Sequence, residues 1–307
     1  MTRRGLGLFV LMSVVWGLPY MLIKVAVRDL SPAMVVEGRT AIGAAVLLPL
    51  AIRQGELRPL LRSWRPLLAY TLAELAIPWY LLSSAERRLP SSLSGLLVAT
   101  VPLIALLLAV ATGHQDRIDR RGLVGLVVGL VGVGVLLGLD VGGGDLGAVG
   151  GVGVVAVGYA TGPLLVARYL GQRSGLALAA VSLTLVAVVY LPVAAWQHPS
   201  RVPPGTVIAA VVVLGLVCTA LAFVAFFELI KELGSTRATI ITYLNPAVAV
   251  VLGVVVLGEQ FKPGTAIGFV LILAGSWLST ARRGRVVRQA KYSVGTTPTG
   301  AVRDTSG

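Results

Sequence analysis

The acidic residue Glu74 lies near the middle of a long apolar run, where a carboxyl group could do chemistry. A charge at the centre of a bilayer costs about 3 kcal/mol or more, so such residues usually face a cavity or a partner. Three roles fit this carboxyl. It could bind and release a proton, pair with the amino group of a substrate, or make a structural hydrogen bond to a neighbouring helix. We predict that Glu74 is the chief functional ionisable residue.

Two further ionisable residues, Glu37 and Arg39, share an earlier apolar run. Positions two apart on a helix point roughly 200° apart, so at most one of them can face a cavity squarely. Both lie near one end of the run, where a long side chain can reach the membrane interface. Glu37 is therefore either a second candidate for ion coupling or an exposed carboxylate.

Several other classes of site find no support in the residue pattern. The sequence has no Ser-His-Asp set, no paired carboxylates and no His/Cys cluster, so we expect neither an enzyme nor a bound metal or cofactor. The formal charge of +13 comes from basic residues in short links, without a basic stripe interleaved with aromatics, which argues against nucleic-acid binding. No filter sequence typical of a channel is evident.

The elements that must position these residues are membrane helices. The chain is 56% hydrophobic with a mean hydropathy of +0.88, far outside the range of soluble proteins. A bilayer-spanning helix needs roughly 20 apolar residues. The sequence predicts an all-α membrane protein with ten transmembrane helices: Leu6–Ile23, Pro32–Ile52, Pro66–Ala85, Ser92–Ala111, Gly122–Leu139, Leu146–Ala167, Leu176–Trp196, Thr206–Ile230, Thr236–Leu257 and Gly264–Thr280.

An internal repeat divides the chain. Adding 144 to a residue number places Ser91 on Ser235 and Pro102 on Pro246, and the same offset joins Lys24 to Arg168. We therefore expect two five-helix domains, 1–140 and 141–281. An odd number of spans makes the second copy enter from the opposite side, so the repeats are inverted, as in many transporters. Duplication that produced only a larger bundle is the plainer alternative.

The orientation follows from the basic residues. With a cytoplasmic N-terminus, 19 Lys and Arg fall on the inside and six on the outside, which predicts a multi-pass protein of the plasma (inner) membrane with both termini cytoplasmic. The tail 282–307 is basic and then polar. We expect it to be disordered and to contact anionic lipids, although orientation bias alone also explains its charges. The six outside residues are Lys24, Arg28, Arg87, Arg88, Arg201 and Lys262.

The order of several loose motifs over residues 5–281 resembles an EamA-type member of the drug/metabolite transporter superfamily. One departure is Gly113-His114, where the family usually has Gly-Glu, which puts only the contacts of that link in doubt. The resemblance implies a secondary transporter of small metabolites, commonly an exporter of amino acids or related compounds. The matching motifs are Val15-Trp16-Gly17, Arg39, Ser84-Ala85 through Pro102, Thr219-Ala220-Leu221-Ala222-Phe223, Gly234-Ser235-Thr236-Arg237-Ala238, Tyr243-Leu244-Asn245-Pro246, Leu257-Gly258-Glu259 and Gly268 to Gly275.

The resemblance, together with prolines that recur inside the apolar runs, implies a substrate site between the halves, on helices one, three, four, six, eight and nine. Arg39, Pro102 and Pro246 are expected to be gating or structural residues. Aromatic rings could stack on a small amphipathic solute, although each could equally be a packed or interfacial residue. Besides Glu74, the candidate substrate-binding residues are Trp16, Tyr20, Tyr80, Tyr159, Tyr243 and Asn245.

The functional prediction is therefore a secondary transporter that exports small metabolites by alternating access, with protons as the candidate coupling ion. A channel and a non-transporting membrane interaction protein are the alternatives. The substrate, the direction of transport, the coupling ion and the oligomeric state are left open by the sequence.

Overall fold

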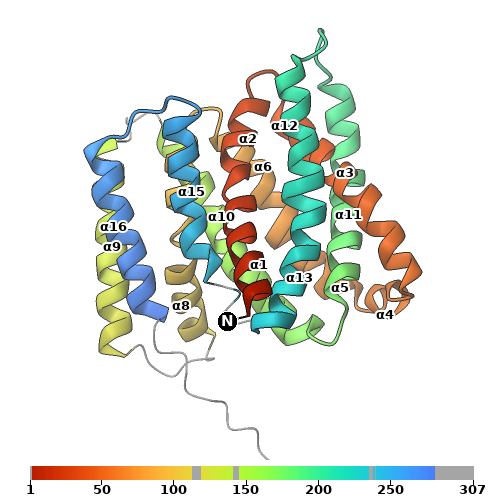
Figure 1. Ribbon diagram of the computed structural model, residues 1–307, viewed down its shortest axis with the longest axis horizontal. Helices are drawn as coiled ribbons and strands as arrows, with labels where there is room; N and C mark the ends of the chain where they lie inside the picture. Colours follow the sequence, from red (N-terminus) through yellow and green to blue (C-terminus); the bar gives the residue numbers. More distant parts are fainter. Residues whose placement is uncertain (1, 113–118, 141–144, 235–237, 239, 281–307) are drawn as a thin grey trace, which may run out of the picture.

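A computed structural model of the chain describes residues 2–112, 119–140, 145–234, 238 and 240–280. These residues form helices joined by short links, without a β-strand among them (Figure 1). Eight helical stretches in the described ranges are long and apolar enough to cross a membrane, and Ile241–Val255 and Pro263–Ser279 are shorter apolar helices. The predicted all-α membrane fold is confirmed at this level. The expected tail 282–307 and the Gly113-His114 link lie outside the described residues.

The first half of the chain contains α1 to α9, and the second half contains α10 to α16. In the first half the helices are α1 Arg3–Val15, α2 Leu18–Ala26, α3 Pro32–Arg53, α4 Leu57–Leu61, α5 Trp64–Tyr70, the π-helix η1 Thr71–Ala76, α6 Ile77–Ala85, α7 Ser91–Val98, α8 Val101–Ala111 and α9 Arg120–Asp140. In the second half they are α10 Leu146–Leu165, the π-helix η3 Val166–Leu170, α11 Gly175–Trp196, α12 Gly205–Gly215, the π-helix η4 Leu216–Leu221, α13 Ala222–Leu233, α15 Ile241–Val255 and α16 Pro263–Thr280.

Two of the expected spans are interrupted, between α1 and α2 and between α7 and α8. Pro102 stands in the first turn of α8, where its missing N–H costs no intrahelical hydrogen bond. The expectation of a proline in mid-helix is therefore corrected for Pro102, which begins a new helix. Pro246 does lie inside α15.

Segments of π-helix occur at matching places in the two halves. η1 joins α5 to α6, and η4 joins α12 to α13, at positions that differ by 145 residues. In η4 the Thr219 hydroxyl donates a 2.8 Å hydrogen bond to the carbonyl of Leu214, five residues back. Such π segments are rare and are often found at functional sites, because the extra residue re-aims the side chains around it.

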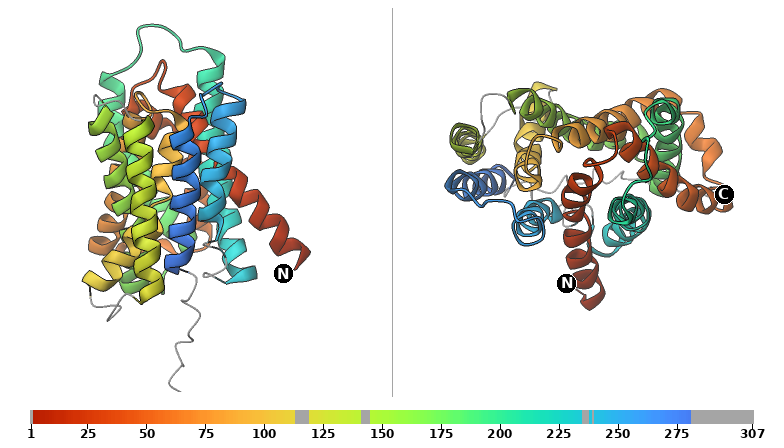
Figure 2. Two further views of the ribbon diagram at one scale, coloured as in Figure 1. Left: turned by 90° about the vertical axis from the view of Figure 1, so that its left-hand side faces the viewer. Right: turned by 90° about the horizontal axis from the view of Figure 1, so that it is seen from above.

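The helices of the two halves pack in a reciprocal pattern. α3 packs on α11, α7 on α15 and α9 on α16, while α1 packs on α13 and α6 on α10. If each expected span of the first half is exchanged for the corresponding span of the second half, the pairs α3–α11, α7–α15 and α9–α16 are unchanged. The pairs α1–α13 and α6–α10 are exchanged with each other. Two of the pairs, α9–α16 and α3–α11, lie at opposite ends of the molecule (Figure 2).

Glycines set the approach of α9 to α16. A Cβ at Gly125 would meet the Gly275 carbonyl at 2.6 Å, and a Cβ at Gly268 would meet the Gly132 carbonyl at 3.1 Å. Small residues permit this close backbone contact between membrane helices. Gly134 and Gly138, which are also four residues apart on α9, face open space instead.

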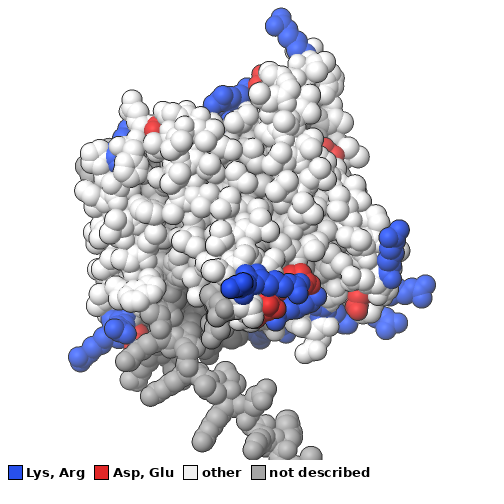
Figure 3. Space-filling view, viewed as in Figure 1, with Lys and Arg blue, Asp and Glu red and all other residues white. Residues whose placement is uncertain are grey.

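Charged side chains gather at the two ends of the bundle, and the visible face between them is white in the space-filling view (Figure 3). This is the pattern expected of a protein whose middle band meets hydrocarbon. The few charges between the ends therefore need individual explanations.

Candidate functional site

Glu74 lies in η1 with its carboxylate against α10. A Cβ at Gly162 would overlap the Glu74 carboxylate, and a Cβ at Gly158 would overlap the Ala73 carbonyl oxygen. One carboxylate oxygen, Oε2, is buried and has no hydrogen-bond partner. Two glycines four residues apart on α10 thus make the space that η1 and its carboxylate occupy.

Arg39 is buried in the first half of α3, about 10 Å along the helix from its first residue. Only 6% of the residue is exposed. Its Nε donates a 3.1 Å hydrogen bond to the Thr219 hydroxyl of η4, and its guanidinium carbon lies 3.6 Å from the centre of the Trp79 ring on α6. The residue therefore joins α3 to the third helix of each half through a polar bond and a cation–π contact.

Tyr159 on α10 links the two ionisable residues. It interacts electrostatically with both Glu74 and Arg39 and contacts the Trp79 indole. Tyr20 on α2 is 7% exposed and also interacts with Arg39 and Tyr159. Tyr20, Arg39, Glu74, Trp79 and Tyr159 are named the central cluster here. It unites residues of α2, α3, η1, α6 and α10.

A second group of predicted residues lies where α1 meets α15. Gly17 bonds to the Val14 carbonyl, so the carbonyl of Ser13 lacks its usual helical donor. The Asn245 side-chain amide, oriented to donate, reaches that carbonyl at 3.1 Å and the Ile241 carbonyl at 2.9 Å. Asn245 thus completes the hydrogen bonding of an interrupted helix, which is a structural task.

The neighbouring aromatics of this group are packed as well. The Trp16 ring lies 4.6 Å from the ring of Phe226 on α13. The Tyr243 hydroxyl donates a 3.2 Å hydrogen bond to the Ser276 carbonyl on α16. Trp16, Tyr243 and Asn245 thus make packing and hydrogen-bond contacts where α1, α13, α15 and α16 meet.

Tyr80 and Glu37 also lie outside the central cluster. Tyr80 is 37% exposed and stacks on Tyr190 of α11 with ring centres 5.8 Å apart. Glu37 is partly exposed, whereas Arg39, two residues on, is buried. This difference agrees with the opposite directions expected of two residues on one helix.

An outer set of charged residues was not assigned any role from the sequence. The Lys24 ammonium donates to the carbonyls of Glu86 and Leu89, at 2.7 and 2.8 Å, just after α6 ends. Glu259, from the link between α15 and α16, accepts hydrogen bonds from the backbone N–H groups of Ser91 (2.6 Å) and Ser92 (3.0 Å) at the start of α7. We call Lys24, Glu86 and Glu259 the outer clamp.

The outer clamp follows simple helix electrostatics. A cation belongs at a helix C-terminus and an anion at an N-terminus, and here each charge comes from a different part of the chain. Gly258 has φ +68°, a conformation that glycine adopts easily, and it turns the chain so that Glu259 reaches α7. The Leu257-Gly258-Glu259 motif thus acquires a physical role that its spacing alone did not reveal.

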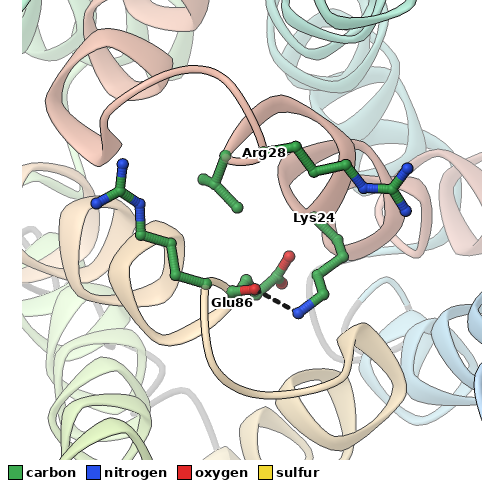
Figure 4. A pocket seen from close by; sticks show the side chains of 5 residues that line it. Lys24, Arg28 and Glu86 are labelled. Carbon is green, nitrogen blue, oxygen red and sulfur yellow. Dashed lines mark hydrogen bonds between the residues drawn. The ribbon is translucent and has the colours of Figure 1, made fainter.

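Glu86 is the unusual member of the outer clamp. It is fully buried, and neither carboxylate oxygen has a hydrogen-bond partner. Burial raises the pKa of Glu86 well above its usual range, and Lys24 opposes that rise. Glu86 and Lys24 line a pocket of ≈ 370 Å³ together with Val27, Arg28 and Arg87 (Figure 4).

The pKa of Glu259 shifts in the other direction. Half-burial by itself raises this pKa, but the hydrogen bonds from Ser92 and Ser91 outweigh it and hold the pKa below its usual range. Glu259 is therefore a charged clamp at neutral pH. Over the described ranges, no group of three or more His, Cys, Asp or Glu side chains is placed to hold a metal ion.

Comparison with known families gives two matches, to residues 3–138 and 147–281, both to the EamA-like transporter family. These cover nearly the whole chain. The chain belongs to the EamA-like transporter family. It is a multi-pass membrane protein and a transporter of this family, as the motif order suggested.

Relatives of this EamA protein are themselves described as transporters. It is 27% identical over 260 residues to the "uncharacterized inner membrane transporter YedA" of Escherichia coli, covering 83% of this chain and 84% of the relative. It is 29% identical over 287 residues to the "probable terminal-alkyne amino-acid exporter" of Streptantibioticus cattleyicolor, covering 89% and 92%. A crystal structure with 20% identity superposes with a TM-score of 0.65 over 92% of this chain and 98% of that one, which shows a shared fold.

Proposed function

We propose that this protein is a secondary transporter that exports small amphipathic metabolites, such as amino acids or related compounds, across the plasma membrane. The observation that carries the proposal is the central cluster. It contains a carboxylate with an unpartnered buried oxygen and a buried guanidinium, both of which interact electrostatically with Tyr159, inside a membrane protein of a transporter family. Intramembrane charges of this kind mark solute or ion pathways.

We also propose that transport uses alternating access between two inverted halves of five helices each, 1–140 and 141–281. The reciprocal helix packing supports this arrangement, because a pseudo-two-fold axis would map α3–α11, α7–α15 and α9–α16 onto themselves and would exchange α1–α13 with α6–α10. The matching π segments η1 and η4 support it too. In this arrangement the two termini are cytoplasmic, the outer clamp lies on the outer side, and the basic tail meets anionic lipid heads.

The proposal that the cargo is an amino acid or a related compound is supported by the exporter from Streptantibioticus cattleyicolor, whose description names an amino-acid cargo. The cluster itself offers both charge signs that a zwitterion requires. Protons are the proposed coupling ion, and Glu74 either takes up the proton or pairs with the amino group of the cargo.

The decisive experiment is a metabolite-release profile of cells with and without the protein, followed by flux in vesicles that contain the purified protein. Saturable flux that is stimulated by substrate on the opposite side supports a carrier. Ohmic current would replace the proposal with a channel, and failure to move any solute in a broad screen would replace it with a non-transporting membrane protein.

A further inference from the structure

Arg39 is a buried cation that makes no ion pair within the described residues and interacts with the buried carboxylate of Glu86 only electrostatically. Within the described residues, the ion pairs are those of Glu228 with Arg4 and Lys231, far from Arg39 in the chain. The single hydrogen bond of its guanidinium is the one from Nε to Thr219. Trp79 covers one face of the guanidinium, and among the described residues no hydrogen bond reaches the edge that carries the two Nη groups. A buried charge in this situation is costly unless a further group accepts hydrogen bonds from it and balances its charge.

The fold does not require an arginine at this position. The bounds of α3 and α11, which pack against each other, differ by 143 residues, so Arg39 falls opposite Ser182. Ser182 is fully buried and uncharged, and its hydroxyl accepts a 2.8 Å hydrogen bond from the Thr71 hydroxyl of η1. The matching position in the other half thus holds a small neutral side chain, so Arg39 is a costly buried charge at a position where the second half carries none.

We propose that Arg39 is the carboxylate-binding residue of the transport site, so that the cargo carries a single carboxylate beside an amino group; this rests on the proposed transport function. A planar guanidinium binds a carboxylate through two parallel N–H···O bonds. The contact with Trp79 holds the guanidinium plane, and Thr219 holds its Nε end. The free Nη edge is then ready for the two oxygens of one carboxylate.

The rest of the central cluster selects a zwitterion over a more highly charged anion. Tyr159 interacts with both Arg39 and Glu74, and Glu74 has a buried oxygen without a partner. An ammonium on Glu74 and a carboxylate on Arg39 leave the site neutral. A doubly charged phosphate would exceed the one positive charge that Arg39 supplies and would face the carboxylate of Glu74.

The test uses the full-length protein in vesicles and a panel of matched solutes. The panel contains the proteinogenic amino acids, their carboxamides and the amines formed by decarboxylation. We expect the wild-type protein to carry one or more of the amino acids and to carry the matching amide and amine about 10- to 100-fold less efficiently, the range expected for losing a charged hydrogen-bond pair.

Arg39→Gln should lower flux of the amino acid about 10- to 100-fold and remove most of its advantage over the amide, and Arg39→Lys should restore part of it. Arg53→Gln is the matched control, because Arg53 is an exposed arginine on the same helix. Correct insertion is checked by size-exclusion profiles in detergent. If Arg39→Gln does not fold, the solute panel on the wild-type protein still decides.

The outcomes separate the two proposals. Absence of flux for every solute in the metabolite-release and vesicle assays overturns the transport function, and this inference with it. Flux of amides or amines as efficient as that of the amino acids overturns this inference alone. The same holds if a folded Arg39→Gln protein keeps the full preference for the acid, since Arg39 would then be a structural tie between α3, α6 and η4.

Discussion

Replacing Glu259 by glutamine should weaken the outer clamp between the halves. The carboxylate accepts two short hydrogen bonds from the N-terminus of α7. Two charge-assisted bonds would be worth about 3–6 kcal/mol if fully buried. Because the side chain is only half-buried, solvent screening reduces this to about 2 kcal/mol. Glutamine keeps one acceptor oxygen, so we expect a loss of about 1 kcal/mol, or about 2–4 °C in the unfolding temperature.

The same reasoning predicts how the stability difference between the wild-type protein and Glu259→Gln changes with pH. A carboxyl whose folded pKa is depressed contributes stability that is fully present above its unfolded pKa and is lost as the pH falls through the folded value. The difference between the wild-type protein and Glu259→Gln should therefore be constant near neutrality. It should shrink as the pH falls below the usual range of a glutamate, because the wild-type clamp then becomes protonated.

The assay is thermal unfolding of the purified protein in detergent at neutral pH and at pH values below 5. Glu56→Gln is the matched control, because Glu56 is exposed and its side chain caps no helix N–H at the start of α4. Equal unfolding temperatures for the two variants, or a difference that grows as the pH falls, would refute the assignment of Glu259 as a charged cap.

Three further predictions concern the site and the topology. Glu74→Gln should abolish pH-driven flux and leave substrate exchange intact if Glu74 carries the proton, whereas loss of exchange as well would assign it to the cargo's amino group; wild-type behaviour would remove Glu74 from the mechanism. In a background with Cys218→Ser, a cysteine at Asp145 should react with a membrane-impermeant label added from outside and one at Arg58 should not, and the reverse pattern would invert the topology. Asn245→Ala should cost about 1–3 kcal/mol, measured by thermal unfolding, because the Ser13 carbonyl loses its donor; an unchanged unfolding temperature would show that this hydrogen bond contributes little.

The class of the fold and the family could be predicted from the sequence, because both follow from local properties. Apolar runs of about 20 residues predict spanning helices whatever their neighbours are, since each backbone group must bond within its own helix in a bilayer. The order of the motifs and the 144-residue offset are visible in the sequence without any knowledge of tertiary contacts. The count of ten spans is less direct, as α15 and α16 are shorter than a typical span.

The assembly of the site could be predicted only in part. Glu74 was singled out by its cost, and the structure places it beside Tyr159 as part of one cluster with Arg39. Trp79 was missed, because a tryptophan in an apolar run has no signal that distinguishes a packing residue from one that lies under a guanidinium. The sequence also contained no sign that Asn245 has a structural role, in which its amide donates to the Ser13 carbonyl at the break between α1 and α2.

What the sequence alone determined is the all-helical membrane class, the family and the positions of costly charges within the apolar runs, since burial in lipid acts on each residue separately. What only the tertiary structure decided is which of those charges meet. Arg39 and Thr219 are 180 positions apart, and Glu259 reaches Ser91 across 168. Such contacts depend on how rigid helices pack against one another, and α10 admits the Glu74 carboxylate only because Gly162 has no side chain there.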